Sequence, residues 1–513
     1  MKIKLLPFLF ILSLLFACVA EDKTYQPEFH YTVSLDDASN QNFGMTLTVK
    51  GMDQDTIVLK LPQWTPGYYQ LMDFTSDLSQ LKVMDEIGNE LKATFNEPNA
   101  WTVTETKNKE LTITYSIKAD RKFVVQSYID TTHAYIVPTN NFLYIDGYLN
   151  QPVTIDVAGM ETCGFSDLIT GLTKTGDFAW SAPDFDILYD SPLLAGKLDR
   201  LPVFEIGGIR HQFGGFMLGD FNREELNSNL EKVVEAATTL MGDIPYGDYH
   251  FIAIGPGFGG IEHLNNTTIS FDGNKIQTEA EMKDVMSFIA HEYFHHYNVK
   301  RIRPYELGPF DYDGINRTAQ LWISEGLTVY YEYMLTRIAG ITNEDDLISS
   351  FEHHINHVEN NEGRLKQSLV QSSYNTWEDG PFGVQGKTIS YYQKGPLVGL
   401  LLDLSLRQAT QNQKSLDDVM RYLYQQYYQQ EQRGFTDAEF QQVCENIAGT
   451  LLTDVFEYVH TTRELDYNQY LQYAGLDLVK TMDRNTGRIQ YSIQKLNNVN
   501  ALQQEILKSW LRE

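Results

Sequence analysis

The strongest constraint on the fold of this chain is a change in the spacing of its apolar residues near residue 202. Before that point, apolar and polar residues alternate in short runs, for example over 29–35 and 111–117. Alternation is typical of strands that bury one face of an antiparallel sheet. After it, apolar residues recur every three or four positions, as in helices. We therefore predict an α+β multidomain chain with an antiparallel β-sandwich over residues 28–201, in which "WTPGYYQ" is a turn between strands.

The second part of the chain carries clear helix boundaries. Asn222 can cap one helix and Gly242 can end it, and Thr278 and Glu281 form the capping box of another. Beyond residue 395 the sequence is mostly amphipathic helix. We divide this part into an α+β domain over 202–394, a helical subdomain over 395–475 and a C-terminal tail over 476–513.

The N-terminus has the features of an export signal. Lys2 and Lys4 precede an apolar run, and a small residue precedes Cys18. Leu-Phe-Ala-Cys at the end of this run resembles a lipobox, in which the cysteine becomes the lipidated first residue of the mature protein. We predict a lipoprotein signal peptide over 1–17, a linker over 18–27 and a lipid anchor in the bacterial cell envelope, at the outer membrane. An ordinary signal peptide or a membrane helix remains the alternative, although the run is short for a membrane span.

Charge and cysteine content exclude other classes of protein. The chain of 513 residues has 68 acidic and 40 basic residues, a net charge of −28. Because binding to phosphates needs a dense basic surface, we expect no nucleic-acid partner. Cys163 and Cys444 lie far apart in the sequence, so no disulfide framework is expected. The oligomeric state does not follow from the sequence.

The segment 289–304, "IAHEYFHHYNVKRIRP", suits a metal ion. His291 and His295 are four residues apart, so on a helix both imidazoles face the same side and can bind one ion. Glu292 projects beside that ion and can act as a general base on a metal-bound water. His296 points about 100° away from His295 on an ideal helix and is not expected to be a ligand. A chance match to this short motif is the alternative.

A third ligand is expected because catalytic zinc usually takes three protein ligands. The apolar segment 321–340 predicts a helix with the single carboxylate of Glu325 among apolar residues. A charge in such surroundings must be paired or metal-bound. We predict one Zn²⁺ per chain on the two histidines and Glu325, with an exposed glutamate as the alternative. Glu332, two turns later, either orients a histidine or lies on the surface.

Two further segments carry candidate substrate contacts. Glu262 follows Gly259 and Gly260, where a carboxylate can receive an ammonium group. Tyr391 and Tyr392 begin an apolar helix, where a phenol can donate a hydrogen bond to an oxyanion. A turn with a capping acid and a core tyrosine are the respective alternatives.

Other charged groups have simpler interpretations. His353, His354 and His357 share helical spacing without a nearby general base, which favours a solvated helix face. Lys300, Arg301 and Arg303 follow the zinc-binding motif. We expect them to form salt bridges to acidic loops rather than to bind substrate.

Five ordered motifs within residues 64–407 resemble those of the glycyl aminopeptidase family, metallopeptidase family 61: "WTPGYY", "GGIEH", "HEYFHHYNVKRIRP", "LWISEGLTVYYEY" and "YYQKGPLVGLLLDLSLR". More distantly, they resemble the larger zinc aminopeptidases. The resemblance implies a thermolysin-like catalytic domain over 202–394, Glu262 as the group that holds the substrate's α-amino group, and Tyr392 as the residue that stabilises the transition state. Many members carry a PDZ domain after the helical region, and residues 476–513 are too few for a full one.

The combined prediction is a zinc-dependent aminopeptidase that removes N-terminal residues from peptides. Zinc polarises the scissile carbonyl, Glu292 moves the proton and Tyr392 steadies the oxyanion. Small first residues such as Gly or Ala are expected. Two alternatives stay open, a zinc endopeptidase on the same scaffold and a non-catalytic lipid-anchored binding protein.

Overall fold

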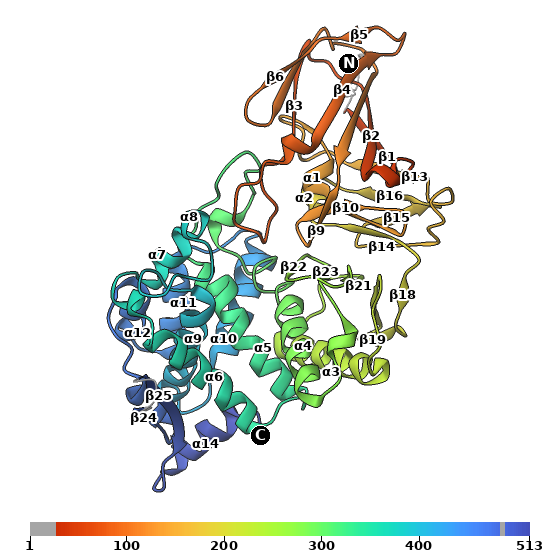
Figure 1. The fold of residues 1–513 in the computed structure, drawn as a ribbon. Coiled ribbons are helices and arrows are strands. Elements are labelled where there is room, and N and C mark those ends of the chain that lie inside the picture. Colours follow the sequence, from red (N-terminus) through yellow and green to blue (C-terminus); the bar gives the residue numbers. More distant parts are fainter. Residues whose placement is uncertain (1–26, 483–487) are drawn as a thin grey trace, which may run out of the picture.

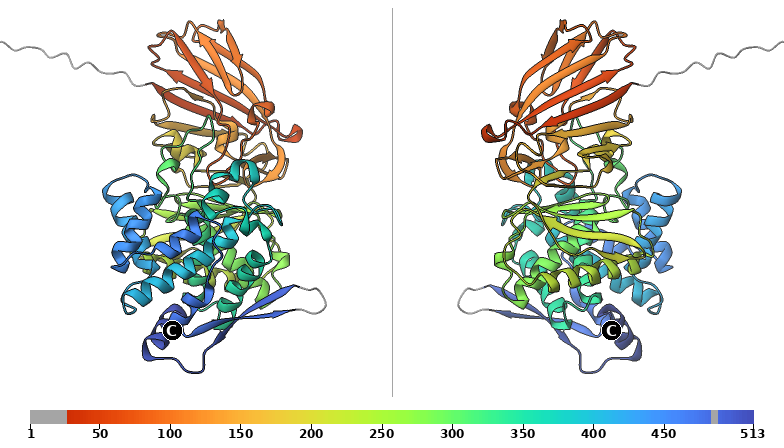
Figure 2. Two further views of the ribbon diagram at one scale, coloured as in Figure 1. Left: turned by 90° about the vertical axis from the view of Figure 1, so that its left-hand side faces the viewer. Right: turned by 90° about the vertical axis from the view of Figure 1, so that its right-hand side faces the viewer.

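The computed structural model describes residues 27–482 and 488–513. The predicted signal peptide and Cys18 lie outside these residues. The β-rich N-terminal part lies at one end of the molecule and the helices of the C-terminal half at the other (Figures 1 and 2). This arrangement confirms the predicted order of a β-rich region followed by a largely helical one.

The described residues of the N-terminal part form three sheets, two short α-helices and two 3-10 turns. An eight-stranded sheet has the spatial order β15 (Thr173–Gly176), β16 (Ala179–Ala182), β13 (Val153–Ala158), β1 (Glu28–Ser34), β2 (Asn42–Lys50), β8 (Leu111–Lys118), β4 (Leu78–Asp85), β5 (Glu90–Leu91). A four-stranded sheet has the order β12 (Tyr144–Ile145), β3 (Thr56–Lys60), β7 (Ala100–Thr104), β6 (Ala93–Asn96). A five-stranded sheet has the order β14 (Asp167–Thr170), β17 (Leu193–Gly196), β11 (His133–Ile136), β10 (Gln126–Ile129), β9 (Asp120–Phe123). The helices are α1 (Pro138–Asn141) and α2 (Phe185–Tyr189).

Most of the alternating apolar residues of these strands form one hydrophobic core, and Tyr135, Ile169 and Leu194 of the five-stranded sheet pack with Ile252 in a smaller cluster. Phe29, Tyr31 and Val33 of β1 are buried, while the residues between them are partly exposed. The pairing is antiparallel with one exception, because β1 and β13 run parallel. Alternation predicts a half-buried strand but does not fix the direction of its partner.

A six-stranded sheet, separate from the three of the N-terminal part, supports the candidate site. Its order is β18 (Asp199–Arg200), β20 (Ile209–Gly215), β21 (Asp248–Ala253), β23 (Asn266–Ile269), β22 (Gly260–Glu262), and β19 (Phe204–Ile206) also pairs with β20. Strands β20, β21 and β23 are parallel, and β22 is an antiparallel edge strand. Since β18 already belongs to this sheet, the sheet begins just before residue 202, within the range that we assign to the first domain.

Helix α3 (Arg223–Met241) begins and ends as its sequence predicts, and helix α4 (Glu279–Phe294) begins as predicted. The Asn222 side chain accepts a hydrogen bond from the Glu225 N–H, and Gly242 ends α3 with a φ of 79°. Thr278 and Glu281 form the capping box of α4. Helix α4 therefore has a fixed start and delivers residues 291–295 at its C-terminal end.

The remaining helices pack around α9, which is buried along most of its length. They are α5 (Leu327–Ile338), α6 (Glu344–Glu359), α7 (Leu369–Tyr374), α8 (Thr376–Asp379), α9 (Tyr391–Ala409), α10 (Leu416–Leu423), α11 (Asp437–Ala448), α12 (Thr453–His460), α13 (Tyr467–Leu471) and α14 (Ala501–Trp510). Between α13 and α14, β24 (Leu476–Met482) and β25 (Ile489–Lys495) form a hairpin. Among the described residues, no helix combines the length and the apolar character that crossing a membrane requires.

Candidate active site

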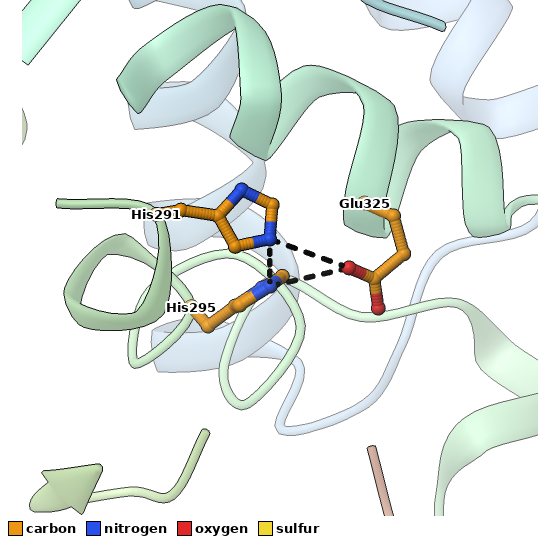
Figure 3. Close-up of side chains that lie close together, drawn as sticks. All are labelled: His291, His295 and Glu325. Carbon is orange, nitrogen blue, oxygen red and sulfur yellow. Dashed lines mark hydrogen bonds and ion pairs between the residues drawn. The ribbon is translucent and has the colours of Figure 1, made fainter. Parts of the chain in front are cut away.

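His291, His295 and Glu325 converge on one point in the interior (Figure 3). The two histidine Nε2 atoms are 3.0 Å apart. The nearer carboxylate oxygen of Glu325 lies 3.2 Å from His295 Nε2 and 3.7 Å from His291 Nε2. All three residues are buried. Two imidazoles and a carboxylate are the donors that zinc prefers, and three ligands leave a fourth position open, so these residues fit a catalytic zinc ion.

The outer nitrogen of each histidine is held by a hydrogen bond. His291 Nδ1 lies 2.9 Å from Glu332 Oε2, and the other oxygen of Glu332 accepts a bond from Ser287. His295 Nδ1 lies 2.8 Å from the backbone oxygen of Asn298. Because each Nδ1 is engaged, each Nε2 is free to face the cluster. Of the two options that the sequence leaves for Glu332, the structure shows the one in which it orients a histidine.

Asn298 ties the two ligand-bearing segments together. Its side-chain nitrogen donates to the backbone oxygens of Ile323 and Ser324 at 2.8 and 3.2 Å, and lies 2.9 Å from Thr328 Oγ1. This bond set fixes the turn that carries Glu325 against the end of α4. Sequence reasoning missed this role, because nothing in the motif shows which segment the asparagine faces.

Glu325 lies in a π-helical turn and not in the regular helix that the sequence predicts. Residues Trp322–Gly326 (η5) form this turn, and α5 follows directly. A Cβ at Gly326 would lie 2.6 Å from the Cα of Gly395 in α9. The two glycines therefore let α9 pass against the π turn. Single π turns inside helices are frequent at functional sites.

Glu292 faces the edge strand β22. A Cβ at Gly260 would lie 2.4 Å from the Glu292 carboxyl carbon, so glycine is needed for this approach. Burial raises the pKa of Glu292 to about 7, against the effect of the two neighbouring histidines. Within the described part of the chain, its Oε2 atom has no hydrogen-bond partner.

The two tyrosines at the start of α9 have different surroundings. Tyr391 OH lies 3.1 Å from Thr376 Oγ1. The ring of Tyr392 lies 6.1 Å from the ring of His291, centroid to centroid. Burial and the Glu325 carboxylate raise the pKa of Tyr392 well above its ordinary value. The Tyr392 hydroxyl is therefore a protonated donor beside the cluster.

Glu262 lies on β22 and is buried. Among the residues that the structure describes, none hydrogen-bonds to its carboxylate. Gly67 of the N-terminal part approaches it so closely that a Cβ there would lie 2.8 Å from one carboxylate oxygen. The segment 64–70, predicted as a turn between strands, thus reaches the catalytic part of the molecule.

A cavity of ≈ 680 Å³ opens in front of the cluster. His291, Glu292 and Tyr392 form part of its wall, and Gly259 and Gly260 form another part. The N-terminal part completes it with residues from two separate segments, namely Gly67, Tyr68, Tyr69, Gln70, Phe123 and Val124. The candidate site is therefore shared between the two halves of the chain.

The other histidines lie outside the cluster. His296 is buried and packs against Tyr297, with ring centroids 3.8 Å apart. The prediction of a solvated face is wrong for His354, which is buried and bonds Tyr333 at 2.9 Å and Gln393 at 2.7 Å. Two partly buried partners on neighbouring helices compensate for the loss of water around this ring.

Lys300 and Arg301, which follow the zinc-binding motif, hold the segment after α4 against neighbouring parts of the chain. Lys300 Nζ lies 2.5 Å from Asp190 of the N-terminal part, as the salt-bridge prediction requires. Arg301 donates to the backbone oxygens of Leu264, His296 and Pro245 instead of to a carboxylate.

Comparisons with known sequences identify both halves. A profile described as the Peptidase M61 N-terminal domain matches residues 30–197, and one described as M61 glycyl aminopeptidase matches residues 284–398. The second range contains both histidines of the cluster, Glu292, Glu325 and Tyr392. No curated protein sequence matches the chain.

Solved structures share the fold. An aminopeptidase N family protein from Idiomarina loihiensis is 25% identical with a TM-score of 0.83, over 89% of this chain and 80% of that one. An M1 zinc metallopeptidase variant from Deinococcus radiodurans with a Tyr-Ser-Ala substrate is 13% identical with a TM-score of 0.53, over 86% and 94%. Legionella pneumophila aminopeptidase A with aspartic acid is 13% identical with a TM-score of 0.52, over 93% and 53%. The two profile matches together cover more than half of the chain and meet at one cavity with the His-His-Glu cluster, and the chain therefore belongs to the M61 peptidase family.

Proposed function

We propose that this peptidase is an aminopeptidase that holds one Zn²⁺ per chain on His291, His295 and Glu325. The observation that carries the proposal is the position of Glu262. This buried carboxylate, without a hydrogen-bond partner among the described residues, lies on the same short strand as Gly260, which touches Glu292. Glu292 lines the cavity, and the Glu262 carboxylate lies directly behind Gly67, which also lines it.

The proposed chemistry assigns one role to each side chain. Zinc, when bound, supplies a Lewis acid that polarises the scissile carbonyl and lowers the pKa of water. Glu292 accepts a proton from the attacking water and delivers it to the leaving amine. Tyr392 donates a hydrogen bond to the negative charge that develops on the carbonyl oxygen.

Glu262 supplies the feature that an aminopeptidase needs and an endopeptidase does not. A buried carboxylate without a partner is costly, and a substrate ammonium group would pair with it through charge-assisted hydrogen bonds. The free ammonium group is common to nearly all peptide N-termini. Gly259 and Gly260 leave room for the substrate backbone on the way to this carboxylate.

A panel of free and N-acetylated aminoacyl substrates, with and without a chelator, tests the proposal. We expect free substrates to be cleaved, acetylated ones to be poor, and the chelator to abolish turnover. Equal cleavage of both would favour the endopeptidase. No chelator-sensitive turnover of either would favour the binding protein.

Two finer proposals, on the preferred first residue and on the lipid anchor, rest on the sequence alone. The preference for Gly or Ala as the first residue is implied by the family resemblance. We also propose that Cys18 is lipidated and anchors the protein in the cell envelope, which the lipobox-like end of the apolar run supports. Incorporation of labelled palmitate into the wild type but not into Cys18→Ala would support the anchor, and labelling of both would refute it.

A further inference from the structure

We propose that a groove between helices α4, α5 and α6 binds the part of the substrate that follows the scissile bond, so that the preferred substrates are oligopeptides of about six residues or more and not dipeptides. The inference rests on the proposed function and names the substrate class of that site. It leaves the expected preference for Gly or Ala as the first residue unchanged.

The groove adjoins the cavity in front of the cluster. It has a volume of ≈ 520 Å³, and Phe288 and Glu332 line both spaces. Phe288 lies about one turn before His291 on α4, and Glu332 binds the outer nitrogen of His291. A peptide whose scissile carbonyl lies at the cluster can therefore continue into the groove along α4.

The groove and the side that we assign to the substrate's amino end have different walls. The amino side is formed by β22 and by Gly67, behind which the Glu262 carboxylate lies. The residues that line the groove come from α4, α5, α6 and the turn before α6. Those of α4 include Ala280, Lys283, Asp284 and Ser287. The first residue and the rest of a bound peptide thus meet different elements of the fold.

The length of the groove sets the length of the peptide that fills it. From Ala280 to His291, α4 advances roughly 16 Å, at about 1.5 Å per residue. An extended peptide advances about 3.3 Å per residue, so roughly five residues fit beyond the scissile bond. Together with the first residue, a substrate of about six residues fills the site.

The polar groups of the groove suit a peptide backbone better than a C-terminal carboxylate. Lys283 lines the groove, but its Nζ already lies 3.0 Å from both Glu279 and Asp346. The Ser287 hydroxyl donates to Glu332, and its oxygen keeps lone pairs that can accept a peptide N–H. The groove therefore suits the middle of a longer peptide and not the end of a short one.

The test compares C-terminal amides that all begin with Gly-Ala and increase in length from the dipeptide to the octapeptide. Release of the first glycine is measured for each. We expect kcat/KM to rise at least about tenfold from the dipeptide to the hexapeptide, because contacts remote from the scissile bond add binding energy in the transition state. Beyond the hexapeptide, kcat/KM should level off.

His353→Trp fills the groove from α6, and His357→Trp is its matched control. Both histidines are exposed and lie one turn apart on α6, but only His353 lines the groove. We expect His353→Trp to lower kcat/KM for the hexapeptide to near the value for the dipeptide. Ala280→Trp fills the groove from α4 and should have the same effect. His357→Trp should keep the wild-type dependence on length.

Retained cleavage of the dipeptide, which ends before the groove, shows that the two groove variants are folded. A wild type that cleaves all lengths with the same kcat/KM would overturn the inference and leave the proposed function standing. So would groove variants that lose the same factor on every peptide, or a loss in His357→Trp equal to that in His353→Trp. Absence of chelator-sensitive glycine release from every peptide would overturn both the inference and the proposed function.

Discussion

Four glutamates surround the two histidines, and their contacts separate their roles. Glu325 contacts both histidines, and although burial raises its pKa, these contacts lower it to about 2. Glu332 binds the outer face of His291. Glu292 and Glu262 contact neither ring at bonding distance; Glu292 lines the cavity, and Glu262 lies behind Gly67 at its wall. Glu325 therefore suits a metal ligand and Glu332 orients a histidine. Glu292 suits proton transfer, and Glu262 suits binding of the substrate's ammonium group.

The proton role predicts the effect of Glu292→Gln. The amide is nearly isosteric but cannot accept the proton, so we expect zinc content to be unchanged and kcat to fall by ~10²–10⁴. Steady-state kinetics with metal analysis of the same sample measure both. Turnover close to that of the wild type would assign the proton transfer to another group.

The ammonium role predicts the effect of Glu262→Ala. A charge-assisted hydrogen bond contributes roughly 1.5–3 kcal/mol, so kcat/KM for free substrates should fall by about one to two powers of ten. Both KM and kcat should change, because the contact also positions the scissile carbonyl. Acetylated substrates serve as the control and should be little affected. An equal loss on both would make Glu262 a structural residue.

At the scale of elements, glycines decide how closely the segments of the site approach one another. The missing side chain of Gly260 leaves space for Glu292, and that of Gly67 leaves space for the Glu262 carboxylate. Gly326 of the π turn and Gly395 of α9 let these two segments pack closely. In each pair the contact is shorter than a Cβ atom tolerates. The cavity therefore depends on backbone approach as much as on its charged side chains.

Gly67→Ala tests this at the boundary between the two parts of the chain. The added Cβ would displace Glu262, so we expect kcat/KM for free substrates to fall at least tenfold, as for Glu262→Ala. Gly67 has a φ of +95°, and Gly88 has a similar φ of +86° with no atom within 4 Å of a Cβ. Gly88→Ala therefore controls for backbone strain alone. Equal losses of activity in both variants would remove the specific role of Gly67.

The sequence predicted those parts of the site that depend on local spacing. His291, Glu292 and His295 follow from their positions on one helix, and the caps of α3 and α4 follow from their end residues. The π turn at Glu325 and the contact between Gly67 and Glu262 could not be predicted from the sequence, because both depend on packing between segments distant in the sequence. The burial of His354 was not predicted for the same reason, since its hydrogen-bond partners come from other helices.

At the scale of the whole molecule, the N-terminal part holds the segments around the site. Asp313, in the segment after the zinc-binding motif, accepts bonds from Lys60, Asn99 and Tyr144 at 2.7–2.8 Å. Asp190 lies 2.5 Å from Lys300 and 3.0 Å from His263, the residue next to Glu262. A single carboxylate thus connects the strand of Glu262 to the segment that follows α4.

Asp190→Asn should weaken this connection. The Lys300 ammonium group is buried and would lose its charged partner, which costs about 3–5 kcal/mol of stability. We also expect KM to rise because Glu262 shifts. Asp167→Asn is the control, since Asp167 pairs with Arg200 between the same parts but is about one third exposed. Its loss should be at most about 1 kcal/mol. Urea unfolding of both variants measures the difference, and equal losses would contradict the role of Asp190.

The central claim is that one zinc ion on His291, His295 and Glu325 makes this chain an aminopeptidase. The most direct measurement is a titration of the chelated, metal-free protein with Zn²⁺, in which release of the first residue from a free peptide is followed. We expect no release without metal, a rise in rate with added zinc and a break at one equivalent per chain. Full activity in the metal-free protein, or zinc-restored cleavage that leaves the first residue attached, would contradict the account.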